Sequence, residues 1–81
     1  MANLIHDRFR TVIANLLHLR SDQVTADLKM GDYPEWDSMG HMNLIASLET
    51  EFGVRFPSYA LPRITSVALI EKELSKLVDL G

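Results

Sequence analysis

The residues best suited to chemistry are the serine and histidine of the run Asp37-Ser38-Met39-Gly40-His41. Ser38 carries a primary hydroxyl, and His41 follows three positions later, so a helix would place the two side chains next to each other. This pair invites a serine nucleophile with a histidine base, yet no third orienting group and no recognisable oxyanion-hole motif accompany it. Asp and Ser are also preferred at helix starts, where their oxygens accept hydrogen bonds from unpaired N–H groups. The residues alone leave Ser38 as either a helix-start residue or a hydroxyl open to modification, and they argue against a hydrolase.

The sequence gives little support for a metal site or a nucleic-acid-binding surface. The three histidines, His6, His18 and His41, lack metal-ligand spacing, and the aspartates of the middle segment lack the spacing of a calcium loop. The arginines near the N-terminus are too few for a basic nucleic-acid-binding face. We therefore expect no catalytic residue, no metal site and no nucleic-acid partner.

Length and composition limit the class of protein. Eighty-one residues with a hydrophobic content of 47% can fill one modest core, so we expect a single domain over residues 1–81. The absence of cysteine suits a reducing compartment. Because the sequence shows neither an apolar run of about 18 residues nor a signal-peptide pattern, we expect a cytoplasmic monomer without membrane insertion.

The net charge of −3 is distributed unevenly. Residues 1–20 carry +2, residues 21–52 carry −6 and residues 53–81 carry +1. An acidic middle segment repels nucleic acid and steers the protein toward basic partner surfaces, mainly through the association rate. An ordinary solvated acidic surface would give the same pattern.

The hydrophobic spacing predicts an all-α fold, a small bundle of three to four helices with a long loop between the first two. The first helix is expected from about Asn3 to about Leu17, the second from the Asp37-Ser38 pair, and the last after the candidate caps Thr65 and Ser66. The predicted core positions of the first and last helices are Ile5, Phe9, Val12, Ile13, Leu16, Leu17, Val67, Ile70, Leu74, Leu77 and Val78.

The segments between these helices differ in kind. Residues 18–37 have no sustained helical period and contain the breakers Gly31 and Pro34, which predicts a loop. Scattered apolar residues should pin this loop to the core: Val24, Leu28, Met30, Tyr33 and Trp36. Between residues 52 and 65, a glycine and two prolines leave room only for a short helical turn near Ser58 to Arg63.

The central helix carries two apolar faces. The face expected in the core comprises Leu44, Ile45, Leu48 and Phe52. The other face, here called the methionine stripe, comprises Met39, Met42 and Ala46. This stripe is predicted to reach the surface, where soft methionine side chains suit a site that meets several partners. The alternative is that the loop 18–37 or the segment 57–62 covers it.

In their order and spacing these features resemble the acyl carrier protein family over nearly the whole chain. The resemblance rests on the Asp37-Ser38-Met39 triplet, the helix that continues to Val54, and the Ile64-Thr65-Ser66-Val67 entry to the last helix. In that family the serine of an Asp-Ser-(Leu/Met) motif is esterified with 4′-phosphopantetheine, whose thiol carries acyl groups as thioesters. The resemblance implies that Ser38 is the attachment site, that coenzyme A supplies the cofactor, and that the protein is a non-catalytic carrier.

The resemblance also implies partners. A phosphopantetheinyl transferase would load Ser38, and an acyl-activating enzyme, a ketosynthase or an acyltransferase would act on the loaded carrier. The same resemblance implies that five residues occupy partner-binding positions: Asp37, Met39, Met42, Ala46 and Glu49. Glu49 would supply charge for a basic partner.

Several positions depart from the common fatty-acid carrier pattern. His41, Asn43 and Thr50 stand where acidic or small polar residues are frequent, and Trp36 and the His41-Met42 pair look more like carriers of secondary metabolism or envelope chemistry. We therefore expect a specialised pathway. A stand-alone peptidyl or D-alanyl carrier stays open, as does an unmodified helical adaptor that binds a partner through the methionine stripe.

Three expectations concern the attached 4′-phosphopantetheine group, here called the arm. Gly40 would leave space beside it. The helix start would favour its phosphodiester, because unpaired N–H groups and the positive end of the helix dipole attract an anion. The acyl chain would fold back between the helices, into weakly packed space under the loop 18–37.

Overall fold

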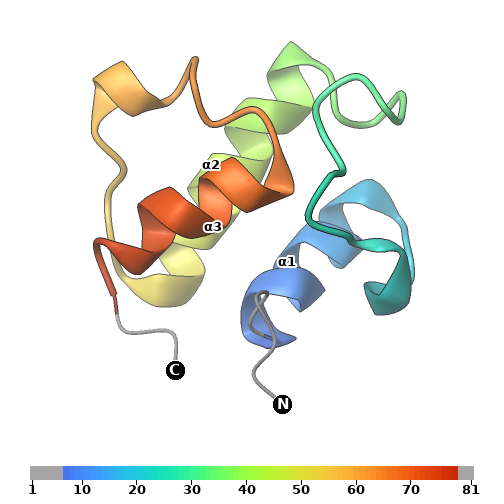
Figure 1. Ribbon diagram of the computed structural model, residues 1–81, viewed down its shortest axis with the longest axis horizontal. Helices are drawn as coiled ribbons and strands as arrows, with labels where there is room; N and C mark the ends of the chain where they lie inside the picture. The colour runs from blue at the N-terminus through green and yellow to red at the C-terminus, as the bar shows by residue number, and fades with distance from the viewer. Residues whose placement is uncertain (1–6, 79–81) are drawn as a thin grey trace.

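A computed structural model describes residues 7–78, which form three α-helices and two short 3₁₀ turns (Figure 1). The helices are α1 (Asp7–Leu17), α2 (Ser38–Phe52) and α3 (Val67–Ser75), and the turns are η1 (Ser21–Gln23) and η2 (Ser58–Ala60). No β-strand occurs among the described residues, which confirms the all-α fold class. Within the same range, no helix combines the length and the apolar character needed to cross a membrane.

The core lies between the three helices, on the faces that the hydrophobic period predicts. α2 buries Leu44, Ile45 and Leu48, with Phe52 partly buried. The other predicted core residues that are fully buried are Phe9, Ile13 and Leu17 of α1 and Val67, Ile70 and Leu74 of α3.

Two predictions concern the ends of the outer helices. Leu77 was expected in the core, but α3 ends at Ser75 and the side chain of Leu77 is 37% exposed, because the helical register that would turn it inward has stopped. The predicted helix start near Asn3 and the core position Ile5 lie outside the described residues.

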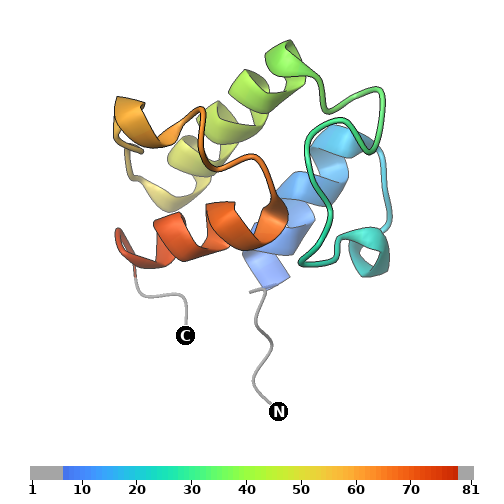
Figure 2. The same cartoon turned by 45° about the horizontal axis from the view of Figure 1, so that its top comes forward.

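The loop of residues 18–37 is packed against the core, as expected. Trp36 is completely buried, Val24 and Leu28 are buried, and Met30 and Tyr33 are partly buried against the core. In both ribbon views this loop passes over one end of α1 before it reaches α2 (Figures 1 and 2).

Backbone hydrogen bonds join the same loop to the start of α3. The N–H of Met30 donates to the Thr65 carbonyl at 2.8 Å, and the N–H of Val67 donates to the Leu28 carbonyl at 2.8 Å. Ser66 caps α3 by accepting a hydrogen bond from the N–H of Leu69. Since first-turn N–H groups have no partner within their own helix, the bonds from Val67 and Leu69 complete the helix start. The two backbone bonds also fix the loop on it.

Candidate functional site

Ser38 is the first residue of α2, and its side chain is exposed. The preceding residue, Asp37, has an extended backbone and caps the helix, because its Oδ1 accepts a hydrogen bond from the N–H of Gly40 at 2.8 Å. This cap fixes the backbone on both sides of Ser38. The structure therefore holds a primary hydroxyl at the surface on a defined helix start.

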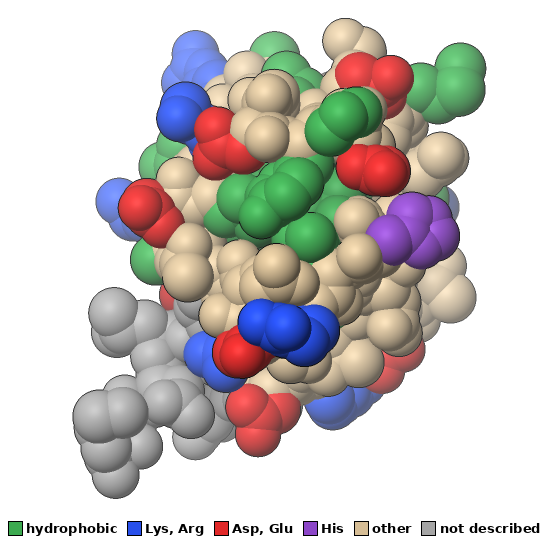
Figure 3. Space-filling model, turned by 90° about the vertical axis from the view of Figure 1, so that its right-hand side faces the viewer, with side chains coloured by type: hydrophobic (Ala, Val, Ile, Leu, Met, Phe, Trp, Pro, Cys, Tyr) green, Lys and Arg blue, Asp and Glu red, His purple; other side chains and the backbone are tan. Residues whose placement is uncertain are grey.

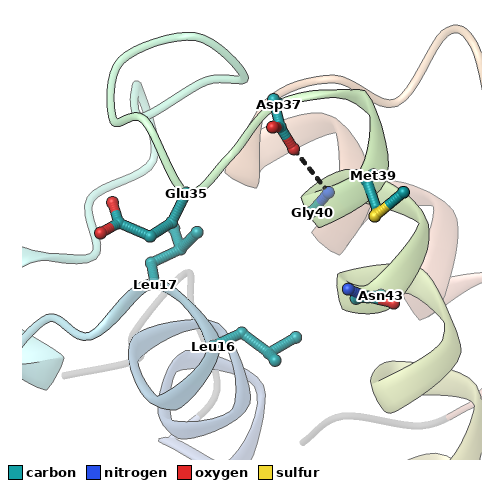
Figure 4. A pocket seen from close by; sticks show the side chains of 7 residues that line it. All are labelled: Leu16, Leu17, Glu35, Asp37, Met39, Gly40 and Asn43. Carbon is teal, nitrogen blue, oxygen red and sulfur yellow. Dashed lines mark hydrogen bonds between the residues drawn. The ribbon is translucent and has the colours of Figure 1, made fainter.

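Gly40 has a different role from the one expected. A Cβ atom at this position would overlap the carbonyl oxygen of Glu35, because the backbone of the loop passes directly against the first turn of α2. The missing side chain therefore makes room for the loop, and the expectation that it also leaves space beside an arm stays a prediction. Figure 4 shows Glu35, Asp37 and Gly40 together at this junction.

His41 is buried, with 6% of its surface exposed, although it lies only three residues after Ser38. Its Nδ1 accepts a hydrogen bond from the indole Nε1 of Trp36 at 3.0 Å, and its Nε2 lies 3.2 Å from the carbonyl oxygen of Leu61. The two rings are stacked, with an interplanar angle of 22°. Both ring nitrogens are thus occupied by structural partners, so the ring cannot serve Ser38 as a general base in this arrangement.

The burial of His41 was missed from the sequence. The only local signal is a tryptophan five residues earlier, whose indole N–H needs an acceptor when the ring is buried. The second partner, the Leu61 carbonyl, lies 20 residues further along the chain, and no periodicity indicates it.

The methionine stripe is exposed. Met39 is 74% and Met42 is 55% exposed, and Ala46 also lies at the surface. The alternative that the loop 18–37 or the segment 57–62 covers this stripe is therefore wrong. Exposed apolar side chains of this size on one helix are a feature of surfaces that meet other molecules.

Glu49 lies at the other end of α2 and is partly buried. Its Oε2 accepts a hydrogen bond from the N–H of Phe56 at 2.8 Å, and its carbonyl accepts from the N–H of Gly53, the left-handed residue that ends the helix. The side chain therefore helps to turn the chain after α2. Its predicted contact with a basic partner stays a prediction.

The acidic loop contains one aspartate with a clearly perturbed pKa. The Asp32 carboxylate accepts hydrogen bonds from the backbone N–H of Lys29 at 3.0 Å and from its Nζ at 3.2 Å. These hydrogen bonds lower the pKa of Asp32 below its ordinary value of 3.8, and the backbone hydrogen bond has the larger effect. In residues 7–78, no three His, Asp or Glu side chains are grouped so that they could hold a metal ion.

Two surface pockets flank the start of α2. One, here called the Glu35 pocket, has a volume of about 270 Å³ and lies between the end of α1 and α2. In Figure 4, Leu16 and Leu17 of α1 face Met39 and Asn43 across it. The space-filling view of this side of the molecule shows apolar side chains gathered at the centre with acidic side chains close by (Figure 3).

The other pocket, here called the serine groove, includes Ser38 itself and has a volume of about 390 Å³. One wall comes from the first turns of α2 and the other from the loop and from the segment before α3. The residues that line it are Met30, Ser38, His41, Met42, Leu61, Pro62 and Thr65.

A three-helix bundle with an exposed, capped serine at the start of its central helix has the features expected of a small carrier protein. A curated acyl carrier protein from Akkermansia muciniphila is 29% identical to this chain over 75 residues, which cover 93% of this chain and 94% of the relative. No family model matches the chain. The relative, together with the helical fold, supports the resemblance of the chain to acyl carrier proteins.

Proposed function

We propose that this protein is a discrete acyl carrier whose Ser38 hydroxyl is esterified with 4′-phosphopantetheine taken from coenzyme A. The observation that carries the proposal is the position of Ser38, an exposed hydroxyl on the capped first residue of α2, in a chain that matches an acyl carrier protein over nearly its whole length. The bound group would supply a terminal thiol that holds acyl groups as thioesters.

The residues around Ser38 fit such a group. The hydroxyl is accessible to a modifying enzyme, and the Asp37 cap holds the helix start in place. The N-terminal end of α2 also carries the positive end of the helix dipole, which favours a phosphodiester attached there. Loading would form a bond between the Ser38 oxygen and a phosphorus atom of coenzyme A. The pyrophosphate bond of coenzyme A would break, adenosine 3′,5′-bisphosphate would leave, and the serine hydroxyl would lose its proton.

The partners follow from the same surface. A phosphopantetheinyl transferase must reach Ser38, and enzymes that load or remove acyl groups would contact the exposed methionine stripe and Asp37, with Glu49 at the far end of α2. The acidic segment of residues 21–52 would steer basic enzyme surfaces toward this helix. Tethering then raises the effective concentration of the thioester at the docked enzyme.

The pathway proposed is a specialised one, in secondary metabolism or envelope chemistry. The support is the pair Trp36 and His41, which departs from the common fatty-acid carrier pattern and which the structure shows as one buried contact. A peptidyl or D-alanyl carrier would use the same Ser38 chemistry with a different cargo. Loading assays with acyl and aminoacyl substrates would separate these cargoes.

The test is the intact mass of the purified protein before and after incubation with coenzyme A and a broad-specificity phosphopantetheinyl transferase. We expect a gain of one phosphopantetheine in the natural protein and in Ser47→Ala, a control serine on the same helix, and no gain in Ser38→Ala. A folded protein that gains no mass with several transferases would contradict the proposal. It would favour the adaptor, which binds a partner through the methionine stripe without modification.

A further inference from the structure

Two exposed sulfur-containing side chains lie beside Ser38. The 81 residues contain four methionines and no cysteine, so thioether groups carry all the sulfur of the polypeptide. Met39 and Met42, in the first turns of α2, are 74% and 55% exposed. Met30 is partly buried against the core, and Met1 lies outside the described residues. Among the described methionines, the exposed ones therefore both belong to the methionine stripe.

These two methionines flank the Ser38 hydroxyl. Met39 follows Ser38 directly in the chain and lines the Glu35 pocket, whereas Met42 lines the serine groove together with Ser38. An enzyme that brings coenzyme A to the Ser38 oxygen must cover the surface on both sides of it, and this surface includes Met39 and Met42. Neither methionine belongs to the core or packs against it, so their chemical state can change without disturbing the core.

A hydroperoxide can change the chemistry of this surface. The sulfur lone pair attacks one peroxide oxygen, an S–O bond forms, the O–O bond breaks, and water leaves when the oxidant is hydrogen peroxide. The apolar thioether becomes a polar, chiral sulfoxide, a change that disrupts methionine-rich interfaces. The carboxylates of Glu35 and Asp37 beside Met39 would repel an anionic oxidant. A neutral hydroperoxide does not meet this repulsion, so it is the class of oxidant that fits the site.

We propose that Met39 and Met42 form a reversible oxidation site that controls the loading of Ser38. This inference rests on the proposed function of Ser38. In the thioether state the two side chains give a docking transferase an apolar contact. In the sulfoxide state docking buries an S=O oxygen against that apolar contact without a hydrogen-bond partner, which disfavours the complex. A methionine sulfoxide reductase with a dithiol reverses the change, because the dithiol is oxidised to a disulfide and the sulfoxide oxygen leaves as water.

Oxidation should act on docking and spare the fold. In the free protein both side chains are exposed, so water can solvate a sulfoxide oxygen at either position. The penalty arises when a partner covers the methionine stripe and removes that water. We therefore expect the KM of the transferase for the carrier to rise, with kcat nearly unchanged, because binding of the carrier is weakened throughout the reaction.

The test uses the full chain in the form whose intact mass shows no attached arm. It is treated with hydrogen peroxide, the peroxide is removed with catalase, and peptide mass spectrometry locates the added oxygen atoms. We expect Met39 and Met42 to be oxidised faster than Met30, with the circular dichroism spectrum and the urea unfolding midpoint unchanged.

Loading is then measured with coenzyme A and a broad-specificity phosphopantetheinyl transferase. The kcat/KM of the oxidised protein should fall by about tenfold or more, because burying an unpaired polar group costs on the order of one tenfold step in affinity. Methionine sulfoxide reductases A and B with dithiothreitol should restore the loading rate. Both reductases are used because each reduces one epimer of the sulfoxide.

Leucine variants provide a matched pair. The double variant Met39→Leu/Met42→Leu keeps apolar side chains of similar volume but has no sulfur in the methionine stripe. It should be loaded at the same rate before and after peroxide treatment. Met30→Leu keeps both sulfur atoms of the stripe and should become as slow as the oxidised natural protein.

Three results would overturn the inference. The first is an oxidised natural protein with unchanged kcat/KM, and the second is a double variant that still becomes slower after peroxide treatment. The third is a lowered urea midpoint of the oxidised protein, because damage to the fold would then explain the slower loading. An untreated natural protein that gains no arm would instead contradict the proposed function itself, so the two failures are distinguishable.

Discussion

The indole Nε1 of Trp36 donates a hydrogen bond to Nδ1 of His41 across 3.0 Å, and this contact joins the end of the long loop to the first turn of α2. A ring that accepts at Nδ1 carries its proton on Nε2, and this nitrogen lies 3.2 Å from the Leu61 carbonyl that can accept it. The neutral imidazole therefore connects three segments of the chain beside Ser38.

Replacing His41 with alanine should lower the free energy of unfolding by about 2–4 kcal/mol, because the buried Trp36 N–H and Leu61 carbonyl both lose their partner and a cavity remains. Urea unfolding followed by tryptophan fluorescence measures this loss. His18→Asn is the matched control, since His18 is exposed and has the left-handed backbone, φ 58°, that asparagine tolerates. A loss in His41→Ala no larger than in the control would show that the ring does not connect these segments.

Gly40→Ala should destabilise the protein even though alanine is the better helix former by about 1 kcal/mol. The added Cβ would overlap the Glu35 carbonyl, so the loop must shift away from α2, at a cost of about 1–3 kcal/mol. Thermal unfolding is the measurement. Thr50→Ala, at an exposed position of the same helix, should instead leave the melting temperature unchanged or raise it slightly. A Gly40→Ala variant as stable as the natural protein would contradict the close approach of the loop.

Features that depend only on residues close together in the chain can be predicted from the sequence. The helices, the buried face of α2 and the exposed methionine stripe follow from hydrophobic periodicity, which is local. The Asp37 cap is local too, because it depends on residues three positions apart. Within the described residues these features were predicted correctly, except that α3 ends before Leu77.

Features that depend on contacts between distant segments were missed. The burial of His41 depends on the Leu61 carbonyl, and the need for glycine at position 40 depends on where the loop passes. The serine groove likewise combines residues from the loop, from α2 and from the segment before α3. None of these contacts has a period or a motif, so tertiary packing alone defines them.

Asp32→Asn should remove a pH-dependent contribution to stability. Because hydrogen bonds from Lys29 lower the pKa of Asp32 below 3.8, the carboxylate stabilises the folded state above its unfolded pKa, and this contribution is lost as the pH falls through the folded pKa. The natural protein should therefore exceed Asp32→Asn in melting temperature at pH 7, and the difference should shrink toward pH 3. Glu35→Gln, which removes the same charge from the same loop, is the control. A difference between Asp32→Asn and the natural protein that does not change with pH would contradict this role.

Substitutions of Asp37 should separate its capping role from its charge. Asp37→Ala loses the hydrogen bond from the N–H of Gly40 and should be destabilised by about 1 kcal/mol. Asp37→Asn keeps an acceptor oxygen, so its free energy of unfolding should be close to that of the natural protein.

If the carboxylate also meets a basic surface on the transferase, Asp37→Asn should be loaded at Ser38 more slowly than the natural protein while its circular dichroism spectrum is unchanged. Loading rates measured by mass at low and high salt would test this, because screening should reduce the difference between the two proteins. Equal rates for Asp37→Asn and the natural protein at low salt, with slower loading only in Asp37→Ala, would mean that Asp37 acts on Ser38 through the helix start and not through a partner contact.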